Sequence, residues 1–225
     1  VVNITITSLF VIGGLGFSVW IDLNRNRKWA RLTVYSRMMI LGTIFINAIA
    51  IILIYLIEYD NPNTLAPLSE SGKWLASWFQ ALTPRTAGFN TLAIDQLEDA
   101  TTAVMLMLMF IGGGSMSTAS GIKVVTFMIL ILATYSYFRR DEAIYVFKRE
   151  IPKETVSKAF ALTIMSIGVS CLAIFSLLLS EKAPMLDIIF EAISALGTVG
   201  LSRGLTANLS SAGELIIIFL MFMGR

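Results

Sequence analysis

The chain has 225 residues, of which 56% are hydrophobic and only 14% are charged, with a formal net charge of +2. Soluble domains carry about 25% charged residues, so this composition predicts an integral membrane protein. The chain has no histidine and one cysteine, Cys171, which excludes a disulfide framework, a Cys/His zinc site and a Ser-His-Asp triad. We therefore expect no enzymatic activity. No basic block is interleaved with aromatic residues, which argues against nucleic acid as a partner.

Several apolar runs have the length of a membrane-spanning helix, which needs about 20 mostly apolar residues. Three of them reach that length without a charge: residues 1–21, 38–57 and 159–180. Residues 100–138 form a longer run with one charge, Lys123, and the tract GGGSMSTASG (112–121) in its middle. The last run, 215–224, is half a span. Because the chain begins and ends inside apolar runs, we expect it to be part of a longer protein.

Two shorter apolar stretches, 74–84 and 184–197, cannot cross a membrane and are flanked by acidic segments. We interpret them as re-entrant half-helices, with amphipathic surface helices as the alternative. The loops 22–37 and 139–158 together hold eleven basic residues. The positive-inside rule therefore predicts that these two loops are cytoplasmic and that the re-entrant stretches face outside.

The sequence contains a repeat at an offset of 111 to 112 residues. FQALTPRTAGF (79–89) matches FEAISALGTVGL (190–201) with one inserted residue. MFIG at 109–112 then matches MFMG at 221–224, and FVIGG at 10–14 is a third copy of this pattern. The predicted unit is a span, a re-entrant helix, a short loop and a second span, and successive units run in the same direction.

The loops that follow the two re-entrant stretches share the pattern T-x-G-x. A loop that replaces the hydration shell of a cation needs carbonyls aimed at one axis, and glycine permits the positive φ that this geometry uses. A helix C-terminus beside the loop adds a favourable dipole for a cation. An ordinary T-x-G turn is the alternative for either loop alone. We interpret both as filter segments whose backbone carbonyls bind the ion: Thr86, Ala87, Gly88, Phe89, Thr198, Val199, Gly200 and Leu201.

The tract 112–121 holds four glycines, each of which costs a helix about 1 kcal/mol relative to alanine. Irregular backbone at membrane depth is tolerated only where it lines water or is buried in protein. We predict a broken helix that gates the pathway below the filter, with a small-residue packing face as the alternative. Lys123 is either part of this gate or snorkels to the interface. The predicted gate residues in this region are Gly112, Gly113, Gly114, Ser115, Ser117, Thr118, Ser120, Gly121 and Lys123.

Together these motifs resemble the Ktr/Trk/HKT superfamily of potassium transporters, and within it the membrane subunit of bacterial Ktr systems. Four segments carry the resemblance: TPRTAGFN (83–90), MFIGGGSMSTASGIKVVTF (109–127), ISALGTVGLSRGL (193–205) and MFMGR (221–225). The resemblance implies an all-α integral membrane fold with repeated helix–pore helix–filter loop–helix units around a pseudo-fourfold pore. Its substrate would be potassium, which crosses the cell membrane through the filter.

The resemblance also assigns parts of the chain to units of that pore. Residues 1–37 are expected to hold the last helix of the second unit and a basic cytoplasmic loop. Residues 38–153 are expected to form the third unit, with a broken second helix, and residues 154–225 a truncated fourth. Arg225 aligns with Gly113 of the preceding copy, and the resemblance implies that it lies beside the gating loop and belongs to the gate.

Partners and location follow from the resemblance alone. It implies a homodimer of the full-length subunit in the cell (plasma) membrane, embedded in the lipid bilayer as a multi-pass protein. It also implies a cytosolic nucleotide-binding regulatory ring of the KtrA type, so nucleotides would bind that ring and not this chain. No cofactor is expected to be covalently bound, and sodium dependence is left open.

A secondary transporter with a midplane binding site at broken helices is the alternative function. That class predicts breaks at matching positions of paired, often inverted repeats. Here the repeats are parallel, and the break is pronounced in one copy only, the tract 112–121. We therefore favour the potassium pathway.

Overall fold

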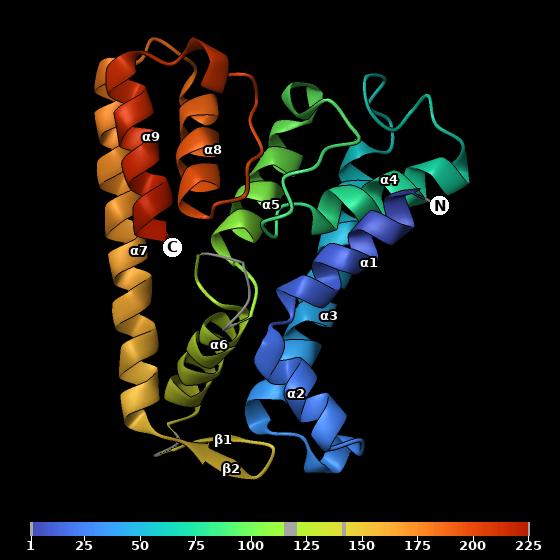
Figure 1. The fold of residues 1–225 in the computed structure, drawn as a ribbon, viewed down its shortest axis with the longest axis vertical. Coiled ribbons are helices and arrows are strands. Elements are labelled where there is room, and N and C mark those ends of the chain that lie inside the picture. Colours follow the sequence, from blue (N-terminus) through green and yellow to red (C-terminus); the bar gives the residue numbers. More distant parts are fainter. Residues whose placement is uncertain (1, 115–120, 141–142, 225) are drawn as a thin grey trace.

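The computed structural model describes residues 2–114, 121–140 and 143–224, and most of them are helical (Figure 1). The helices of the described chain are α1 (Val2–Gly14), α2 (Phe17–Arg25), α3 (Val34–Glu58), α4 (Glu70–Leu82), α5 (Asp99–Phe110), α6 (Val124–Arg139), α7 (Lys153–Ser180), α8 (Met185–Leu196) and α9 (Ser211–Gly224). Short 3-10 turns lie at Trp29–Arg31, Ile94–Gln96 and Thr206–Asn208.

Within the described residues, the only two strands form a small hairpin in the loop 139–158. Strands β1 (Ile144–Val146) and β2 (Arg149–Ile151) pair antiparallel, with Tyr145 opposite Glu150. Phe147 and Lys148 form the two-residue turn with φ of +49° and +65°, the left-handed pair that tight hairpin turns require. The hairpin closes the end of the molecule between α6 and α7 (Figure 1).

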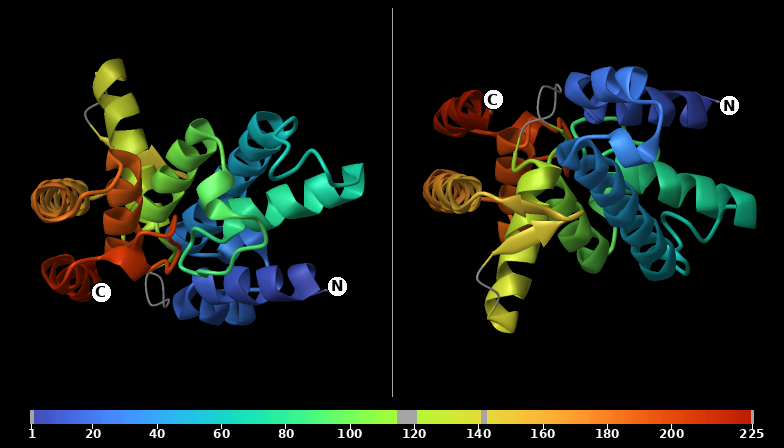
Figure 2. Two further views of the ribbon diagram at one scale, coloured as in Figure 1. Left: turned by 90° about the horizontal axis from the view of Figure 1, so that it is seen from above. Right: turned by 90° about the horizontal axis from the view of Figure 1, so that it is seen from below.

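The helices form two groups that pack in the same way. α3 packs against α4 and α5 in the first group, as α7 packs against α8 and α9 in the second. α5 also contacts α8, as α1 contacts α4. Seen from the side and from above, α5 lies on the side of the first group that faces α8 (Figures 1 and 2). The packing therefore repeats as the sequence does.

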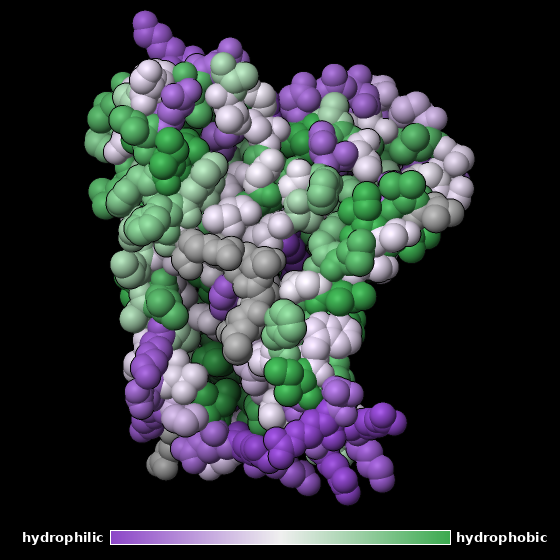
Figure 3. Space-filling view, in the orientation of Figure 1, coloured by the Kyte–Doolittle hydropathy of each residue, from purple (hydrophilic) through white to green (hydrophobic). Residues whose placement is uncertain are grey.

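Two helices, α3 and α7, are long and apolar enough to cross a membrane. They confirm the helices predicted over 38–57 and 159–180. α3 begins after Thr33, whose side chain accepts a hydrogen bond from the Ser36 N–H at 3.2 Å, the usual bond of an N-cap. On the surface, hydrophilic residues gather at the two ends with an apolar band between them (Figure 3). This distribution fits a protein that lies in a bilayer.

The prediction of one continuous helix over residues 1–21 is wrong. α1 ends at Gly14, and α2 leaves it at an angle of 86°. Gly16, between them, has a φ of +87°, which glycine adopts without a steric penalty. The Trp20 indole N–H donates to the Ile12 carbonyl at 2.8 Å and ties α2 to α1. The helix therefore ends at FVIGG (10–14), as α5 ends within MFIGG (109–113), so the expectation of a pronounced break in one copy only is also wrong.

The helices predicted at 74–84 and 184–197 are confirmed as α4 and α8. The C-terminal turns of both are enclosed by protein: in α4, Phe79 and Leu82 are at most 2% exposed, and in α8, Ala195 and Leu196 are at most 6% exposed. The first residues of each helix, Glu70 and Met185, are exposed. A surface helix keeps one face exposed along its whole length, so this burial favours helices that enter the protein with their C-terminal ends first.

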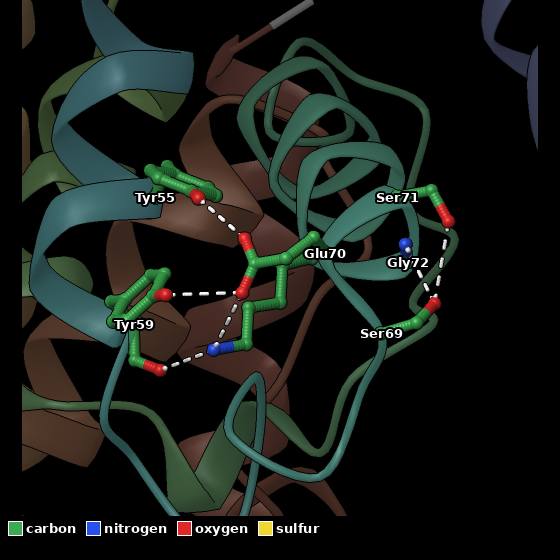
Figure 4. A network of polar contacts seen from close by, with 7 residues as sticks. Tyr55, Tyr59, Ser69, Glu70, Ser71 and Gly72 are labelled. Carbon is green, nitrogen blue, oxygen red and sulfur yellow. Dashed lines mark hydrogen bonds and ion pairs between the residues drawn. The ribbon is translucent and has the colours of Figure 1, made fainter.

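The N-terminal end of α4 is fixed to α3 by a polar network (Figure 4). Glu70 accepts hydrogen bonds from the hydroxyls of Tyr59 and Tyr55, both at 3.0 Å. These bonds, that of Tyr59 first, hold the pKa of the Glu70 carboxyl below its ordinary value. Ser69 caps the helix by accepting a hydrogen bond from the Gly72 N–H at 3.3 Å. The network sets the point from which α4 runs into the protein.

Candidate ion-binding site

The loops that follow α4 and α8 lie against each other, although they are separated by more than one hundred residues. A Cβ placed on Gly200 would lie 3.8 Å from the Cα of Gly88, and one placed on Gly88 would overlap the carbonyl oxygen of Val199. The two backbones therefore touch with no side chain between them. Of the residues predicted to line a filter, the structure thus brings Gly88 into contact with Val199 and Gly200. The others lie beside this contact along the two loops: Thr86, Ala87, Phe89, Thr198 and Leu201.

Both loops have positive φ at the same two positions. The glycines have positive φ, +72° at Gly88 and +87° at Gly200, as predicted. The threonines two residues earlier also have positive φ, +60° at Thr86 and +50° at Thr198, which the sequence did not predict. A left-handed β-branched residue costs about 1 to 3 kcal/mol and persists only where its surroundings hold it. The residue between the threonine and the glycine, Ala87 or Val199, has negative φ. The sign of φ therefore alternates along both loops.

The carbonyls of the two loops fall into two sets. The Phe89 carbonyl accepts a hydrogen bond from the Thr83 hydroxyl, and the Leu201 carbonyl accepts one from the Ser194 hydroxyl at 2.6 Å. By contrast, no donor in the described part of the chain bonds to the carbonyls of residues 86–88 or 198–200. Neither hydroxyl was predicted. The available signal is that both copies of the repeat keep a hydroxyl at this matching position.

Charged residues fix the chain where it leaves the second loop. The Arg203 guanidinium donates to Asp187 Oδ1 at 2.7 Å and to Thr102 Oγ1 at 2.8 Å, so it joins α8 to α5. Glu191, which is buried, accepts a hydrogen bond from the Ser202 hydroxyl at 2.8 Å. Hydrogen bonds to charged groups are stronger than those between neutral groups, so these contacts hold the segment after the loop to both groups of helices.

A further cation, Arg85, directly precedes the first loop. Its side chain is buried, and its Nε and Nη2 atoms have no hydrogen-bond partner among the described residues. With Phe10 of α1, Thr86 and Phe89 it lines a cavity of about 380 Å³. The first loop is therefore bordered by the second loop on one side and by this cavity and α1 on another.

The tract predicted to break the helix does so. α5 ends at Phe110 and α6 begins at Val124. The Gly112 N–H donates to the Ile122 carbonyl at 2.8 Å, and the Ile122 N–H donates to the Phe110 carbonyl at 3.1 Å, so the two ends of the tract are tied together. Of the predicted gate residues, the structure describes Gly112, Gly113, Gly114, Gly121 and Lys123. Those outside the described residues are Ser115, Ser117, Thr118, Ser120 and Arg225.

The start of this tract contacts the other break in the chain. The Gly114 N–H donates to the Gly14 carbonyl at 2.8 Å. A Cβ on Gly114 would overlap the carbonyl oxygen of Leu15, so a larger residue would push the two segments apart. The glycine-rich segments that the repeat aligns are therefore in direct contact, which their sequence similarity did not predict.

All residues of the chain, 1–225, match the model of the TrkH family, described as cation transport proteins. The chain belongs to this family. Ktr system potassium uptake protein B of Bacillus subtilis is 45% identical over 224 residues, which are 100% of this chain and 50% of that protein. The protein of the same name from Vibrio alginolyticus is 40% identical over 228 residues, with the same two coverages. The potassium/sodium uptake protein NtpJ of Enterococcus hirae is 34% identical over 98% of this chain and 49% of its own length.

The fold is also that of a solved member of the TrkH family. The crystal structure of the potassium transporter TrkH from Vibrio parahaemolyticus superposes with a TM-score of 0.83 at 19% identity, over 99% of this chain and 49% of that one. Membership of the family confirms the resemblance inferred from the motifs, and the superposition confirms the helical transporter fold. The chain spans about half the length of the relatives it matches.

Proposed function

We propose that this chain forms part of a potassium uptake pathway across the cell membrane, in which backbone carbonyls of the two filter loops bind the ion. One observation carries the proposal: the sign of φ alternates in the same way in two adjacent loops, and six of their carbonyls have no donor among the described residues. Such carbonyls can replace the hydration shell of a cation. The relatives' names support potassium as the ion, and the name of NtpJ supports a role for sodium.

In this proposal the chain supplies consecutive units of a pseudo-fourfold pore. Residues 1–37 end the second unit, residues 38–153 form the third and residues 154–225 belong to the fourth. The support is the matched packing of α3, α4 and α5 with α7, α8 and α9. The other filter loops would come from the part of the relatives that this chain does not span.

We propose an orientation from the charges at the two ends of the molecule. The loops 22–37 and 139–158, which hold most of the basic residues, lie at the same end of the structure, away from the N-terminal ends of α4 and α8 (Figure 1). The positive-inside rule makes that end cytoplasmic. The filter loops are then reached from outside, in a multi-pass protein of the plasma membrane.

The tract 112–121, with Lys123 and Arg225, is proposed as the gate of this pathway. The support is its break between α5 and α6 and the docking of Gly114 on Gly14. Deleting residues 115–120 from the full-length parent should raise potassium flux and keep selectivity. A flux that falls or stays the same, in protein that reaches the membrane, would contradict the gate.

Partners are proposed from the relatives' names alone. "Ktr system" names a system with further components. This supports a nucleotide-binding cytosolic ring of the KtrA type, which would bind a homodimer of the full-length subunit.

A secondary transporter stays as the second candidate function, because the breaks at Gly14–Gly16 and at 112–121 occupy matching positions. Its midplane site would then lie where these two breaks touch.

Substituting Gly200→Asp in the full-length parent tests the main proposal. The variant places a carboxylate at the contact of the two loops, and we expect potassium-requiring cells to lose uptake although the protein reaches the membrane. Gly204→Asp is the matched control, because Gly204 also has a positive φ, +97°, and lies in open space. Unchanged uptake with Gly200→Asp would mean that the loops do not line the path, and would favour the secondary transporter.

A further inference from the structure

Thr83 and Ser194 make the same bond in the two units. Each lies at the C-terminal end of its helix, α4 or α8, and each side chain is buried, at 0% and 3% exposure. Each hydroxyl donates to the carbonyl of the residue that follows the loop glycine, Phe89 in one loop and Leu201 in the other. Each loop is therefore closed on its own helix by one side chain.

We infer that Thr83 and Ser194 are positioning residues that set the spacing of the filter carbonyls, and with it the preference for potassium over sodium. The inference rests on the proposed function. We call the two hydrogen bonds, from Thr83 to Phe89 and from Ser194 to Leu201, the tethers. The inference also revises the predicted ligands, because the Phe89 and Leu201 carbonyls accept the tethers. The ion is then left to the carbonyls of residues 86–88 and 198–200.

The left-handed threonines explain why the loops need such a tether. Thr86 and Thr198 hold a backbone conformation that β-branched residues avoid, and such strain persists only where surrounding contacts oppose its release. The bond from Thr83 to Phe89 joins a residue before Thr86 to the residue after Gly88, so both positive-φ residues lie within the segment that it closes. The bond from Ser194 to Leu201 spans Thr198 and Gly200 in the same way. Without the hydroxyl, the loop ends are free to move as the strain relaxes.

Selectivity depends on this restraint because sodium is smaller than potassium. Carbonyls that can move inward coordinate the smaller ion better, whereas carbonyls held at a fixed spacing favour the ion that fits it; both the cavity size and the field of the carbonyls change with their positions. The first loop already rests on the second through Gly88 and Val199. The two tethers fix the remaining ends of the loops.

The experiment compares potassium and sodium uptake by the full-length parent and four variants. Thr83→Val and Ser194→Ala remove the hydroxyls with little change in volume, and the conservative controls Thr83→Ser and Ser194→Thr give each unit the residue of the other. Because a buried hydrogen bond contributes a modest net free energy, we expect each hydroxyl-free variant to lower the potassium preference about two- to tenfold. The hydroxyl-bearing variants should keep the parent's preference.

Two results would overturn the inference. One is an unchanged potassium preference in Thr83→Val and Ser194→Ala at normal membrane abundance. The other is an equal loss in the hydroxyl-bearing variants, which would assign the effect to packing. If Thr83→Val fails to reach the membrane, Ser194→Ala tests the same bond in the other unit.

Gly200→Asp separates the two proposals. If it abolishes uptake while the hydroxyl-free variants keep the parent's preference, the filter stands and the tethers are wrong. If it leaves uptake unchanged, the filter itself is wrong, whatever the hydroxyl variants do.

Discussion

Glu58 and Glu181 bind the chain in the same way in the two units. The Glu58 carboxylate accepts a hydrogen bond from the backbone N–H of Glu98 at 2.9 Å, and the Glu181 carboxylate accepts one from the backbone N–H of Ser210 at 3.2 Å. Glu98 and Ser210 directly precede α5 and α9. A carboxylate at the start of a helix satisfies a free N–H and interacts favourably with the helix dipole. The acid at the end of α3 thus caps α5, and the acid at the end of α7 caps α9.

Substituting Glu58→Gln should destabilise the protein. Glu58 is fully buried and also accepts hydrogen bonds from Asn61 Nδ2 at 2.7 Å and Thr64 Oγ1 at 2.6 Å. An amide would turn an N–H₂ toward one of these donors, and an unsatisfied buried group costs about 1 to 3 kcal/mol. Thermal unfolding of the purified full-length protein measures the effect. Asp60→Asn, at an exposed carboxylate outside these networks, is the control and should change stability little.

The Glu181 contact predicts a dependence of stability on pH. Hydrogen bonding, chiefly from the Ser210 hydroxyl, lowers the pKa of Glu181 from its ordinary 4.5. A lowered folded pKa means that the stabilisation is complete above pH 4.5 and is lost as the pH falls through the folded value. The difference in melting temperature between the parent and Glu181→Gln should therefore be constant near neutral pH and shrink below about 4.5. A difference that does not change with pH would contradict this.

Gly114→Ala should disturb the gate and leave the filter intact. A Cβ there would overlap the Leu15 carbonyl oxygen, so the bond from Gly114 to Gly14 would be broken. We expect a higher potassium flux at the parent's selectivity, measured as uptake by cells that require potassium. Gly13→Ala is the control, because nothing lies within 4 Å of its Cβ. Equal behaviour of the two variants would argue that the contact has no part in gating.

Gly42→Ala should weaken the packing of α3 on α6. A Cβ at Gly42 would lie 2.8 Å from Val124 Cγ1, and overpacking of this kind costs about 1 to 3 kcal/mol. The melting temperature of the purified protein should fall. Gly168→Ala in α7 meets nothing within 4 Å and should cause no loss. A stable Gly42→Ala variant would show that α3 and α6 can separate without cost.

The sequence predicted those elements whose length and apolar composition are distinctive. α3, α7, α4 and α8 were all found from these two properties, and the glycines of the T-x-G loops predicted positive φ at Gly88 and Gly200. The turn at Gly16 was missed because the residues on both sides of it are as apolar as a continuous span. Left-handed Thr86 and Thr198 were missed because threonine disfavours that conformation.

The match of Glu58 with Glu181 could not be found from the repeat. Ser210 follows Glu98 by 112 residues, the offset of the repeat, but Glu181 follows Glu58 by 123. The connection from α3 to α4 is longer than that from α7 to α8, at 59–69 against 181–184, which shifts the two acids out of register. Their equivalence appears only once the helices are packed.

We expect potassium to be bound by backbone carbonyls of residues 86–88 and 198–200. Diffraction from crystals of the full-length parent, with thallium in place of potassium, tests it most directly. We expect anomalous density within coordination distance of the carbonyls of residues 86–88 and 198–200, and its loss in Gly200→Asp. Density only beside the tract 112–121, with none at these carbonyls, would contradict this.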